Sequence, residues 1–466
     1  MVAPIPGAAR SVRERLESTL TPLEALRTLR SDAHPFALSG TWLGGGAILG
    51  SEPLHVVAGP GGADPFDTLD ARTALEASAD VGAMPHVGGG WVGYLGYRAG
   101  HLVEDLPHGP SRPRPLPDWW LAWHDHVIRF DPDSGWWFEA LWTEERAEAL
   151  AARRMLLAER LASASPPPHP VGCSEFVATP GPAAHRAAVR RTIDLIEAGD
   201  IYQANVCRRL DATLEGDALD LFVAGASVLD PPYAAFLDLG HGRAVVSLSP
   251  EQFLRREHDR VTTRPIKGTR RRSGDADADA SARAELLASA KERAENVMIV
   301  DLMRNDLGRV CIPGSVEVPE LFTIEAHPGL WHLASEVTGR LRPDVGDGGL
   351  LRAAFPPGSV TGAPKVRSME VISEVEATGR EVYTGCIGMA SPVAGAEWNV
   401  GIRSFEVDGP AVWLGVGGGI VAESDPQAEL DECRAKAAPL IEAIGARMAD
   451  EPVADTTGAP PTNVGA

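Results

Sequence analysis

Apolar residues follow two different patterns along the chain. From Pro35 onward, short apolar runs separated by glycine predict antiparallel strands joined by tight turns, as in residues 36–43 and 47–50. Further along, such runs alternate with stretches in which apolar residues recur every three or four positions, which is typical of amphipathic helices. The chain is therefore predicted to combine strands and helices over most of its length.

The same patterns give approximate bounds for individual elements. Residues 1–30 predict a polar tail followed by one helix, whose apolar positions are Leu16, Leu20, Leu23 and Leu26. Other helices are predicted over residues 144–162, 185–198, 280–304, 365–375 and 425–447. Strands are predicted within residues 201–206, 244–248, 310–342, 383–389, 399–407 and 411–416. The acidic residues 275–279 predict a mobile loop, and the proline-rich residues 356–365 predict a stiff loop that opens a helix.

A Ser/Pro-rich segment at residues 163–170 is typical of an extended, exposed linker. It divides the chain into an N-terminal region, residues 1–162, and a second region, residues 171–449. Residues 450–466 are polar and poor in large apolar side chains, which predicts a disordered tail.

Two features of the N-terminal region resemble ligand sites at first sight. The glycine-rich residues 88–97 lack both GxGxxG and GK[ST], so close packing of backbone in a sheet is the favoured interpretation over phosphate binding. Six tryptophans follow, which could line a pocket but are predicted to fill the core between sheets. They are Trp119, Trp120, Trp123, Trp136, Trp137 and Trp142.

Charge and composition restrict the possible partners. The formal net charge of -21 argues against nucleic acid, which is bound by clustered lysine and arginine, so an anionic substrate would need a local cationic pocket. No apolar run is long enough for a membrane span and no signal peptide is visible, which predicts a cytoplasmic protein with no membrane partner. The five cysteines are scattered and predict neither disulfides nor a zinc site.

Lysine is rare, because only four of the 43 Lys and Arg residues are lysine, namely Lys267, Lys291, Lys365 and Lys436. Lys267 lies between Pro265 and Gly268. An amine can lose its proton and attack carbon, whereas a guanidinium stays charged, so Lys267 is a candidate nucleophile. A surface lysine in a β-turn remains an equal alternative on the spacing alone.

Five blocks together resemble the chorismate-utilising enzymes, and the resemblance extends over about residues 88–440. They are residues 199–203 (GDIYQ), 247–251 (SLSPE), 265–269 (PIKGT), 293–310 (RAENVMIVDLMRNDLGRV) and 361–365 (TGAPK). The family implies an α+β fold in which two large antiparallel β-sheets pack as a sandwich with helices on the outside. The N-terminal region then packs on the chorismate-binding part.

The resemblance implies that Mg²⁺ is held by glutamates on two helices, Glu295 on one and Glu429 and Glu432 on the other. Magnesium prefers oxygen ligands and keeps several waters, which suits carboxylates that join it to a substrate carboxylate. Without the resemblance, solvated glutamates on exposed helix faces would be the better interpretation.

The resemblance also assigns the substrate contacts and the reacting groups. The substrate-binding set is Thr269, Tyr383, Arg403, Lys436, Gln203 and the amides of Gly417, Gly418 and Gly419. Glu251 matches the general acid that protonates the departing C4 hydroxyl, and we expect burial or a hydrogen bond to raise its pKa. His332 matches an active-site histidine, with a core histidine as the alternative.

Lys267 separates the branches of the family. Anthranilate synthases usually carry alanine in this motif, whereas aminodeoxychorismate synthases carry lysine, which is thought to attack C2 of chorismate before ammonia adds at C4. That branch leads to 4-aminobenzoate and folate, and takes its ammonia from a separate glutamine amidotransferase subunit. Two alternatives stay open: an anthranilate synthase component, and a non-catalytic subunit that binds only a partner or an amino acid.

Overall fold

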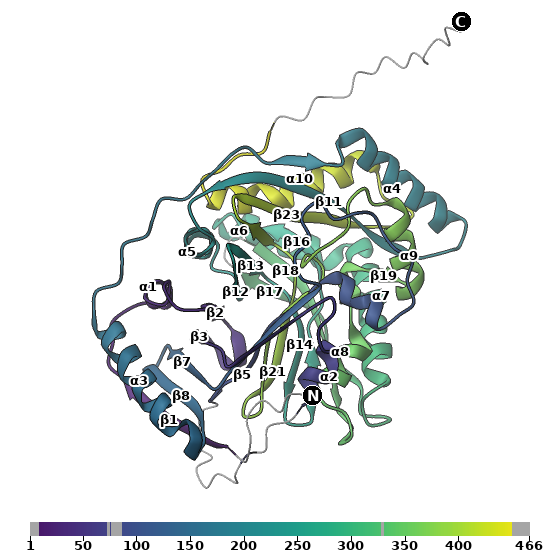
Figure 1. Ribbon diagram of the computed structural model, residues 1–466. Helices are drawn as coiled ribbons and strands as arrows, with labels where there is room; N and C mark the ends of the chain where they lie inside the picture. The colour runs from purple at the N-terminus through teal and green to yellow at the C-terminus, as the bar shows by residue number, and fades with distance from the viewer. Residues whose placement is uncertain (1–8, 72–74, 76–85, 328–329, 450–466) are drawn as a thin grey trace, which may run out of the picture.

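Two large antiparallel sheets run through the whole chain (Figure 1). The computed structural model describes residues 9–71, 75, 86–327 and 330–449. The tail predicted for residues 450–466 lies outside these ranges, as does the start of the tail predicted at the N-terminus. Because helices cover the two sheets, the predicted α+β sandwich is confirmed.

The first sheet has thirteen described strands. Their order is β1 (Arg10–Leu16), β8 (Gly135–Trp142), β7 (His126–Asp131), β3 (Gly46–Gly50), β2 (Phe36–Gly40), β12 (Tyr233–Gly240), β13 (Arg243–Ser249), β22 (Ser404–Asp408), β23 (Ala411–Ile420), β11 (Gln203–Glu215) and β10 (Val177–Thr179). Two short strands, β9 (Gly172–Cys173) and β19 (Gly362–Ala363), also pair with β11.

The second sheet has ten described strands. Their order is β16 (Ile266–Arg271), β18 (Leu330–Arg340), β15 (Arg260–Thr263), β14 (Gln252–Glu257), β21 (Gly395–Val400), β20 (Cys386–Ser391), β5 (Gly90–Leu95), β6 (Trp119–His124) and β4 (His55–Ala58). Strand β17 (Glu317–His327) pairs with β18 on its other edge. Strands from before and after residues 163–170 lie in both sheets, so the two regions share one framework.

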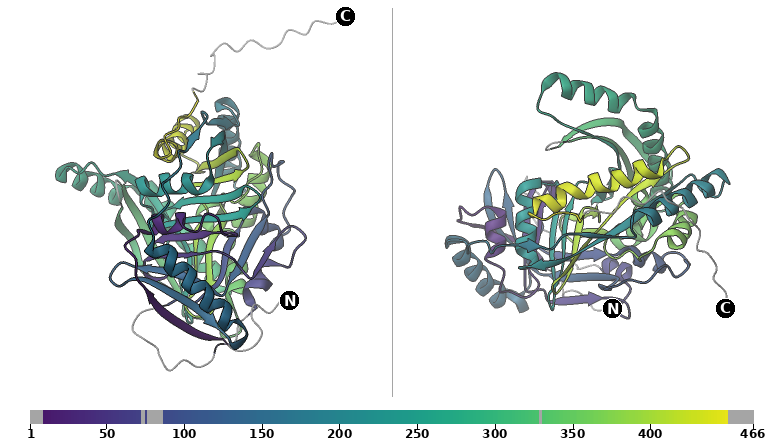
Figure 2. Two further views of the ribbon diagram at one scale, coloured as in Figure 1. Left: turned by 60° about the vertical axis from the view of Figure 1, so that its left-hand side comes forward. Right: turned by 90° about the horizontal axis from the view of Figure 1, so that it is seen from above.

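The helices lie outside the sheets. They are α1 (Pro22–Arg27), α2 (Pro65–Asp70), α3 (Ala147–Ala162), α4 (Pro182–Glu197), α5 (Ala218–Leu229), α6 (Ala276–Ala288), α7 (Ala290–Gly308), α8 (Asp347–Ala354), α9 (Lys365–Val375) and α10 (Pro426–Ala443). Helices α10 and α4 pack together along β23 and β11 (Figure 1). Figure 2 shows α6 standing out from the body beside the strands at one edge of the second sheet.

The core between the sheets takes its side chains from both. One buried cluster joins Leu38 and Leu237 of the first sheet to Val92 and Ile387 of the second. Aromatic side chains supply much of the buried area. Trp119, Trp120, Trp123 and Trp136 are buried as predicted, while Trp137 and Trp142 are partly exposed and lie under the guanidinium groups of Arg13 and Arg10.

The glycine-rich block packs backbone against backbone, as predicted. Gly93 lies in β5, and a Cβ atom there would come within 1.9 Å of the carbonyl oxygen of Trp120 in the neighbouring strand. At Gly90 the same atom would lie 2.3 Å from the carbonyl oxygen of Ala390. Only glycine allows strands β20, β5 and β6 to approach this closely.

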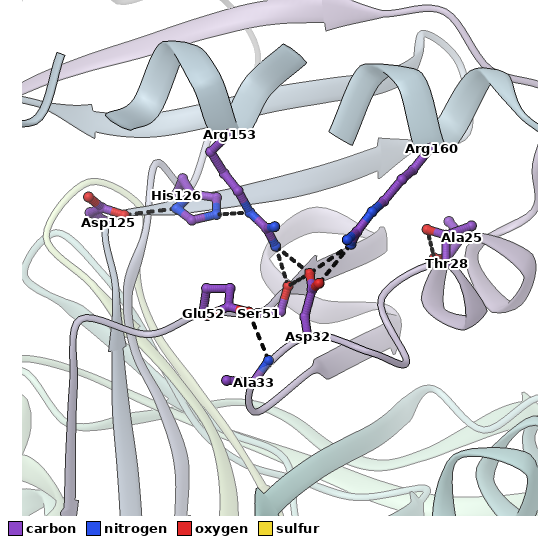
Figure 3. Close-up of polar contacts among 10 residues, drawn as sticks. All are labelled: Ala25, Thr28, Asp32, Ala33, Ser51, Glu52, Asp125, His126, Arg153 and Arg160. Atoms are coloured by element: carbon purple, nitrogen blue, oxygen red, sulfur yellow. Dashed lines mark hydrogen bonds and ion pairs between the residues drawn. The ribbon is translucent and has the colours of Figure 1, made fainter. Parts of the chain in front are cut away.

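A network of charged groups fastens α3 to the strands beneath it (Figure 3). Arg153 and Arg160 of α3 bind the carboxylate of Asp32 at 2.6 and 2.8 Å. Arg153 also donates from Nε to Nε2 of His126 at 3.2 Å, so the Nδ1–H of His126 donates to Asp125 at 2.8 Å. The N-terminal region is therefore held by buried ion pairs as well as by apolar packing.

The prediction of one helix within residues 1–30 is wrong about where that helix begins and ends. Residues 10–16 form strand β1 on the edge of the first sheet, and α1 occupies only Pro22–Arg27. Proline disfavours helix in the residue before it, and Thr21 exchanges hydrogen bonds with Glu24 as a capping box. The helix therefore begins at Pro22. Leu16 and Leu20, which precede it, do not belong to a helix.

Two further predictions need correction between residues 275 and 308. Asp275 accepts a hydrogen bond from the amide of Ala278, so the acidic stretch predicted as a mobile loop is the first turn of α6. The single helix predicted over residues 280–304 is two helices, because Ser289 is non-helical and its side chain caps α7 through the amide of Glu292. Apolar periodicity does not register such a break.

Candidate active site

Glu251 lies directly after β13 and is only 5% exposed. The hydroxyl of Ser359 and the amide of Ile266 lie beside its carboxyl group and favour its charged form. Burial raises the pKa of Glu251 to about 7, and the Ser359 hydrogen bond and the charge of Lys267 oppose that rise. The carboxyl group is therefore partly protonated near neutral pH, as a general acid requires.

Lys267 lies in strand β16 and is half-buried, so it does not occupy a surface turn. Its Nζ donates to the carbonyl oxygen of Ser359 at 3.2 Å. The positive charge of Lys267 lowers the pKa of both Glu251 and Glu295. The amine thus lies close to the predicted acid and to a predicted metal ligand.

The three predicted metal ligands come from α7 and α10. Burial raises the pKa values of Glu295 and Glu429, and the charge of Glu429 raises that of Glu295 further. Burial also raises the pKa of Glu432, but Lys436 at 2.7 Å outweighs it and the net shift is downward. The structure therefore gathers these carboxylates into one negatively charged cluster.

Gly418 explains how this cluster fits against the sheet. A Cβ atom at Gly418 would lie 2.8 Å from Oε2 of Glu429 and 3.9 Å from Oε1 of Glu432. Any other residue would crowd the carboxylates. Oxygen donors held in such a cradle fit the preference of a hard divalent cation.

The carboxylate oxygens of Glu295, Glu429 and Glu432 do not all lie within 4.8 Å of one another. Among the residues that the structure describes, only one group of three His, Cys, Asp or Glu side chains has its possible metal-binding atoms within 4.8 Å of one another. It consists of His169, Asp217 and Asp220. Arg30 already forms ion pairs with both aspartates of that group. Carboxylates that are spaced more widely suit magnesium, which keeps several of its waters when it binds.

Arg403 supplies an uncompensated positive charge. Over the described parts of the chain, its guanidinium makes no hydrogen bond or ion pair with another residue, and burial lowers its pKa. Tyr383 lies beside it, with its hydroxyl 3.4 Å from the Sγ of Cys207. A partly buried cation without a protein partner is suited to binding an anionic ligand.

Lys436 joins the sheet to α10. Its Nζ donates to the carbonyl oxygen of Gly417 at 2.9 Å and pairs with Glu432 at 2.7 Å. The predicted glycines Gly417, Gly418 and Gly419 lie within β23 itself, whereas the sequence predicted them after the strand. Strand β22 pairs with β23 only as far as Leu414, so beyond that residue this edge of β23 has no partner among the described strands.

Gln203 lies at the other end of the same glycines. It is fully buried, and a Cβ atom at Gly419 would come within 2.6 Å of its Nε2. Neither Nε2 nor Oε1 of Gln203 has a hydrogen-bond partner among the described residues. Because buried amides are normally paired, this amide is available to a bound ligand.

Thr269 and His332 are partners across strands β16 and β18. The hydroxyl of Thr269 lies 3.1 Å from Nδ1 of His332, which is 2% exposed. Thr269 lies in the same strand as Lys267, two residues further along, so this pair borders the proposed nucleophile.

Sequence reasoning missed residues that support this region. Ser359 contacts both Glu251 and Lys267, and Lys365 binds Asp306 and the carbonyl oxygen of Ala354 at 2.6 Å each. Lys291 lies 4.0 Å from Glu295. All four lysines therefore lie in or beside the site, and their rarity was the available signal.

A family model described as chorismate binding enzyme matches residues 44–442. The chain belongs to this family. It is 39% identical to "Aminodeoxychorismate synthase component 1" of Salmonella typhimurium over 74% of each chain. It is 35% identical to "Anthranilate synthase component 1" of Streptomyces coelicolor, over 93% of this chain and 88% of the relative.

Solved structures agree with this family. Anthranilate synthase component I from Streptococcus pneumoniae superposes with a TM-score of 0.72 at 27% identity, over 94% of this chain and 93% of that one. MenF, the menaquinone-specific isochorismate synthase from Escherichia coli, has the same TM-score at 19% identity and supports the fold alone. This chorismate-binding enzyme is thus a chorismate-utilising enzyme of the type shared by the two component 1 proteins.

None of the helices in the described ranges combines the length and the apolar character needed to cross a bilayer. The cytoplasmic location stays a prediction.

Proposed function

We propose that this enzyme converts chorismate and ammonia into 4-amino-4-deoxychorismate, as the first component of an aminodeoxychorismate synthase. The observation that carries the proposal is the amine of Lys267, held by Ser359 beside a buried acid, Glu251, whose pKa is about 7. Anthranilate formation needs no such nucleophile. The identity to aminodeoxychorismate synthases supports the same choice.

In the first proposed step, Lys267 Nζ gives up a proton to solvent water, and its free lone pair then forms a bond to C2 of chorismate. The two ring double bonds shift by one position, the C4–O bond breaks, and the proton of Glu251 passes to the hydroxyl, which leaves as water. Nζ then loses a second proton to solvent water, so that the adduct is a neutral secondary amine.

In the second step, ammonia attacks C4 while the double bonds shift back and the C2–N bond breaks. Lys267 Nζ regains both protons from solvent water as it leaves, and Glu251 takes one proton from the nitrogen bound at C4. The acid and the amine therefore return to their starting states, and the net reaction exchanges hydroxyl for amino at C4.

Binding of the dianion is assigned to separate parts of the site. Arg403 and Tyr383 would hold one carboxylate, and Lys436 with the backbone of residues 417–419 would hold nearby polar groups. Gln203 offers its unpaired amide. These groups orient the ring so that C2 faces Lys267 and the C4 hydroxyl faces Glu251.

Mg²⁺ is the proposed cofactor, and Glu295, Glu429 and Glu432 would hold it. When bound, it would neutralise these carboxylates and attract a carboxylate of the substrate. In a thermal-shift titration, we expect Mg²⁺ to raise the melting temperature of the wild type but much less that of Glu432→Gln. An equal rise in both proteins would remove Glu432 from the metal site.

Ammonia is proposed to come from a glutamine amidotransferase subunit, because the relatives are named as component 1 of their synthases. The chain alone should then use ammonium but not glutamine. Adding an amidotransferase subunit of an aminodeoxychorismate synthase should restore glutamine-dependent turnover.

The reaction is tested by incubating the protein with chorismate, Mg²⁺ and ammonium and identifying the product by mass spectrometry. We expect 4-amino-4-deoxychorismate, and Lys267→Ala should lower its formation at least about 100-fold, since the covalent route is lost. Arg191→Ala, which removes an exposed cation of α4 paired with Glu374, is the control. Anthranilate as the wild-type product, or full activity in Lys267→Ala, would contradict the proposal.

A further inference from the structure

The nucleophile and the acid of the proposed reaction do not touch each other. Lys267 lies in β16 and Glu251 follows β13, and no hydrogen bond or ion pair joins their side chains in the described structure. Ser359 contacts both. Its carbonyl oxygen accepts a hydrogen bond from Nζ of Lys267 at 3.2 Å, and its hydroxyl lies beside the carboxyl group of Glu251, whose charged form it favours.

Ser359 is buried, with 7% of its surface exposed, and lies in the segment between α8 and α9. Lys365 fastens one end of this segment by binding Asp306 of α7 and the carbonyl oxygen of Ala354. In the middle, the carbonyl oxygen of Val360 accepts from Arg380 at 3.0 Å.

A second set of contacts stiffens the same segment. The hydroxyl of Thr361 donates to the carbonyl oxygens of Pro357 and Gly358 at 3.2 and 3.3 Å. Gly358 packs closely on α7, since a Cβ atom there would lie 2.6 Å from the Cδ2 of Leu302. The two polar groups of Ser359 are thus presented from a backbone that is held at several points.

We propose that Ser359 is a positioning residue that sets the relative placement of the nucleophile Lys267 and the acid Glu251. The inference rests on the proposed function and adds to it the residue that couples its two reacting groups.

The carbonyl oxygen determines how the amine is turned. A neutral amine has two N–H bonds and one lone pair. When one N–H donates to Ser359, rotation about the last side-chain bond is restricted, and the lone pair stays directed away from the carbonyl. A free lysine would sample many orientations and lose much of this advantage.

The hydroxyl acts on the acid. A donated hydrogen bond favours the charged carboxylate, so it opposes the rise that burial causes in the pKa of Glu251. Without it, the carboxyl group would hold its proton to higher pH and would be free to rotate. Ser359 therefore influences both the proton affinity and the direction of the acid.

The test compares Ser359→Ala with Ser359→Thr, which keeps the hydroxyl. Ser373→Ala is the matched control, because the Ser373 hydroxyl donates within α9 to the carbonyl oxygen of Met369 at 3.0 Å. Two measurements are made on each protein: the pH profile of ammonium-dependent kcat/KM, and the titration of Glu251 by ¹³C NMR without substrate, assigned with Glu251→Gln.

We expect Ser359→Ala to lower kcat about 10-fold and to move the alkaline limb of the profile and the NMR titration upward by about one pH unit. Ser359→Thr should recover most of both, and Ser373→Ala should leave both unchanged. An unmoved Glu251 titration in folded Ser359→Ala would overturn the inference. Because the NMR measurement needs no turnover, it decides the role of Ser359 even if wild-type protein makes a different product.

Discussion

Lys436 and Glu432 lie one turn apart on α10, and their charged groups are 2.7 Å from each other. The same amine donates to the carbonyl oxygen of Gly417 in β23. The helix that carries two of the proposed metal ligands is therefore tied to the strand that lines the substrate site. An i,i+4 ion pair on a helix surface stabilises the helix by about a few tenths of a kcal/mol. The pair between Lys436 and Glu432 also holds Glu432 in place beside β23.

Replacing Lys436 by methionine should weaken chorismate binding. The substitution removes a cation near the proposed substrate and leaves Glu432 without its partner, so KM for chorismate should rise about 30-fold. Arg434→Met is the control, since Arg434 pairs with the exposed Asp431 on the same helix at 2.9 Å. Steady-state kinetics at saturating ammonium would measure the difference, and equal KM values would contradict the assignment.

The pKa of Glu251, about 7, predicts the pH dependence of the reaction. A general acid must carry its proton, so kcat/KM should fall as pH rises through about 7 and should be retained below it on this limb. Glu251→Gln should lower the rate at least about 100-fold, because the C4 hydroxyl then leaves without a proton donor. Survival of the alkaline limb at full rate in Glu251→Gln would exclude Glu251 as the acid.

Arg403 should matter to function more than to stability. Its partly buried guanidinium has no partner among the described residues, so Arg403→Met removes an uncompensated charge. We expect kcat/KM to fall about 100-fold or more, while the melting temperature stays the same or rises. A thermal scan beside the kinetic assay separates the two effects, and a large loss of stability would show that Arg403 is structural.

The network around Asp32 should stabilise the N-terminal region in a pH-dependent way. Burial raises the pKa of Asp32, but hydrogen bonds from Arg153, Arg160 and Ser51 outweigh it and leave the pKa below its usual value. Because the folded pKa is lowered, this stabilisation is complete above the unfolded pKa, about 3.9, and is lost as pH falls through the folded pKa.

Asp32→Asn should therefore lower the free energy of unfolding by about 2 kcal/mol at pH 7, with a smaller difference from wild type below about pH 4. Urea unfolding at several pH values measures both. Asp301→Asn, in an exposed pair with Arg304, is the control and should change stability little. A pH-independent difference for Asp32→Asn would argue against the ion pairs as its cause.

Local sequence was enough to predict those helices and strands whose ends are marked by nearby residues such as proline. Helix α4 was predicted nearly in full, and strand β13 was predicted with Glu251 just beyond its end, because apolar periodicity and Pro250 act locally. The break at Ser289 was missed because the apolar pattern continues through it. Strand β1 was missed because its partner β8 lies over a hundred residues away.

The sequence by itself determined which chemical groups this enzyme has: one amine in a PIKGT motif, an acid after a strand, glutamates on two helices and few other lysines. Only the tertiary structure decided that Ser359 lies between Lys267 and Glu251, that Arg403 has no described partner and that residues before and after 163–170 share both sheets. The physical reason is that residue types and periodicity are local properties. Contacts, burial and the pKa values that follow from them depend on segments brought together from distant parts of the chain.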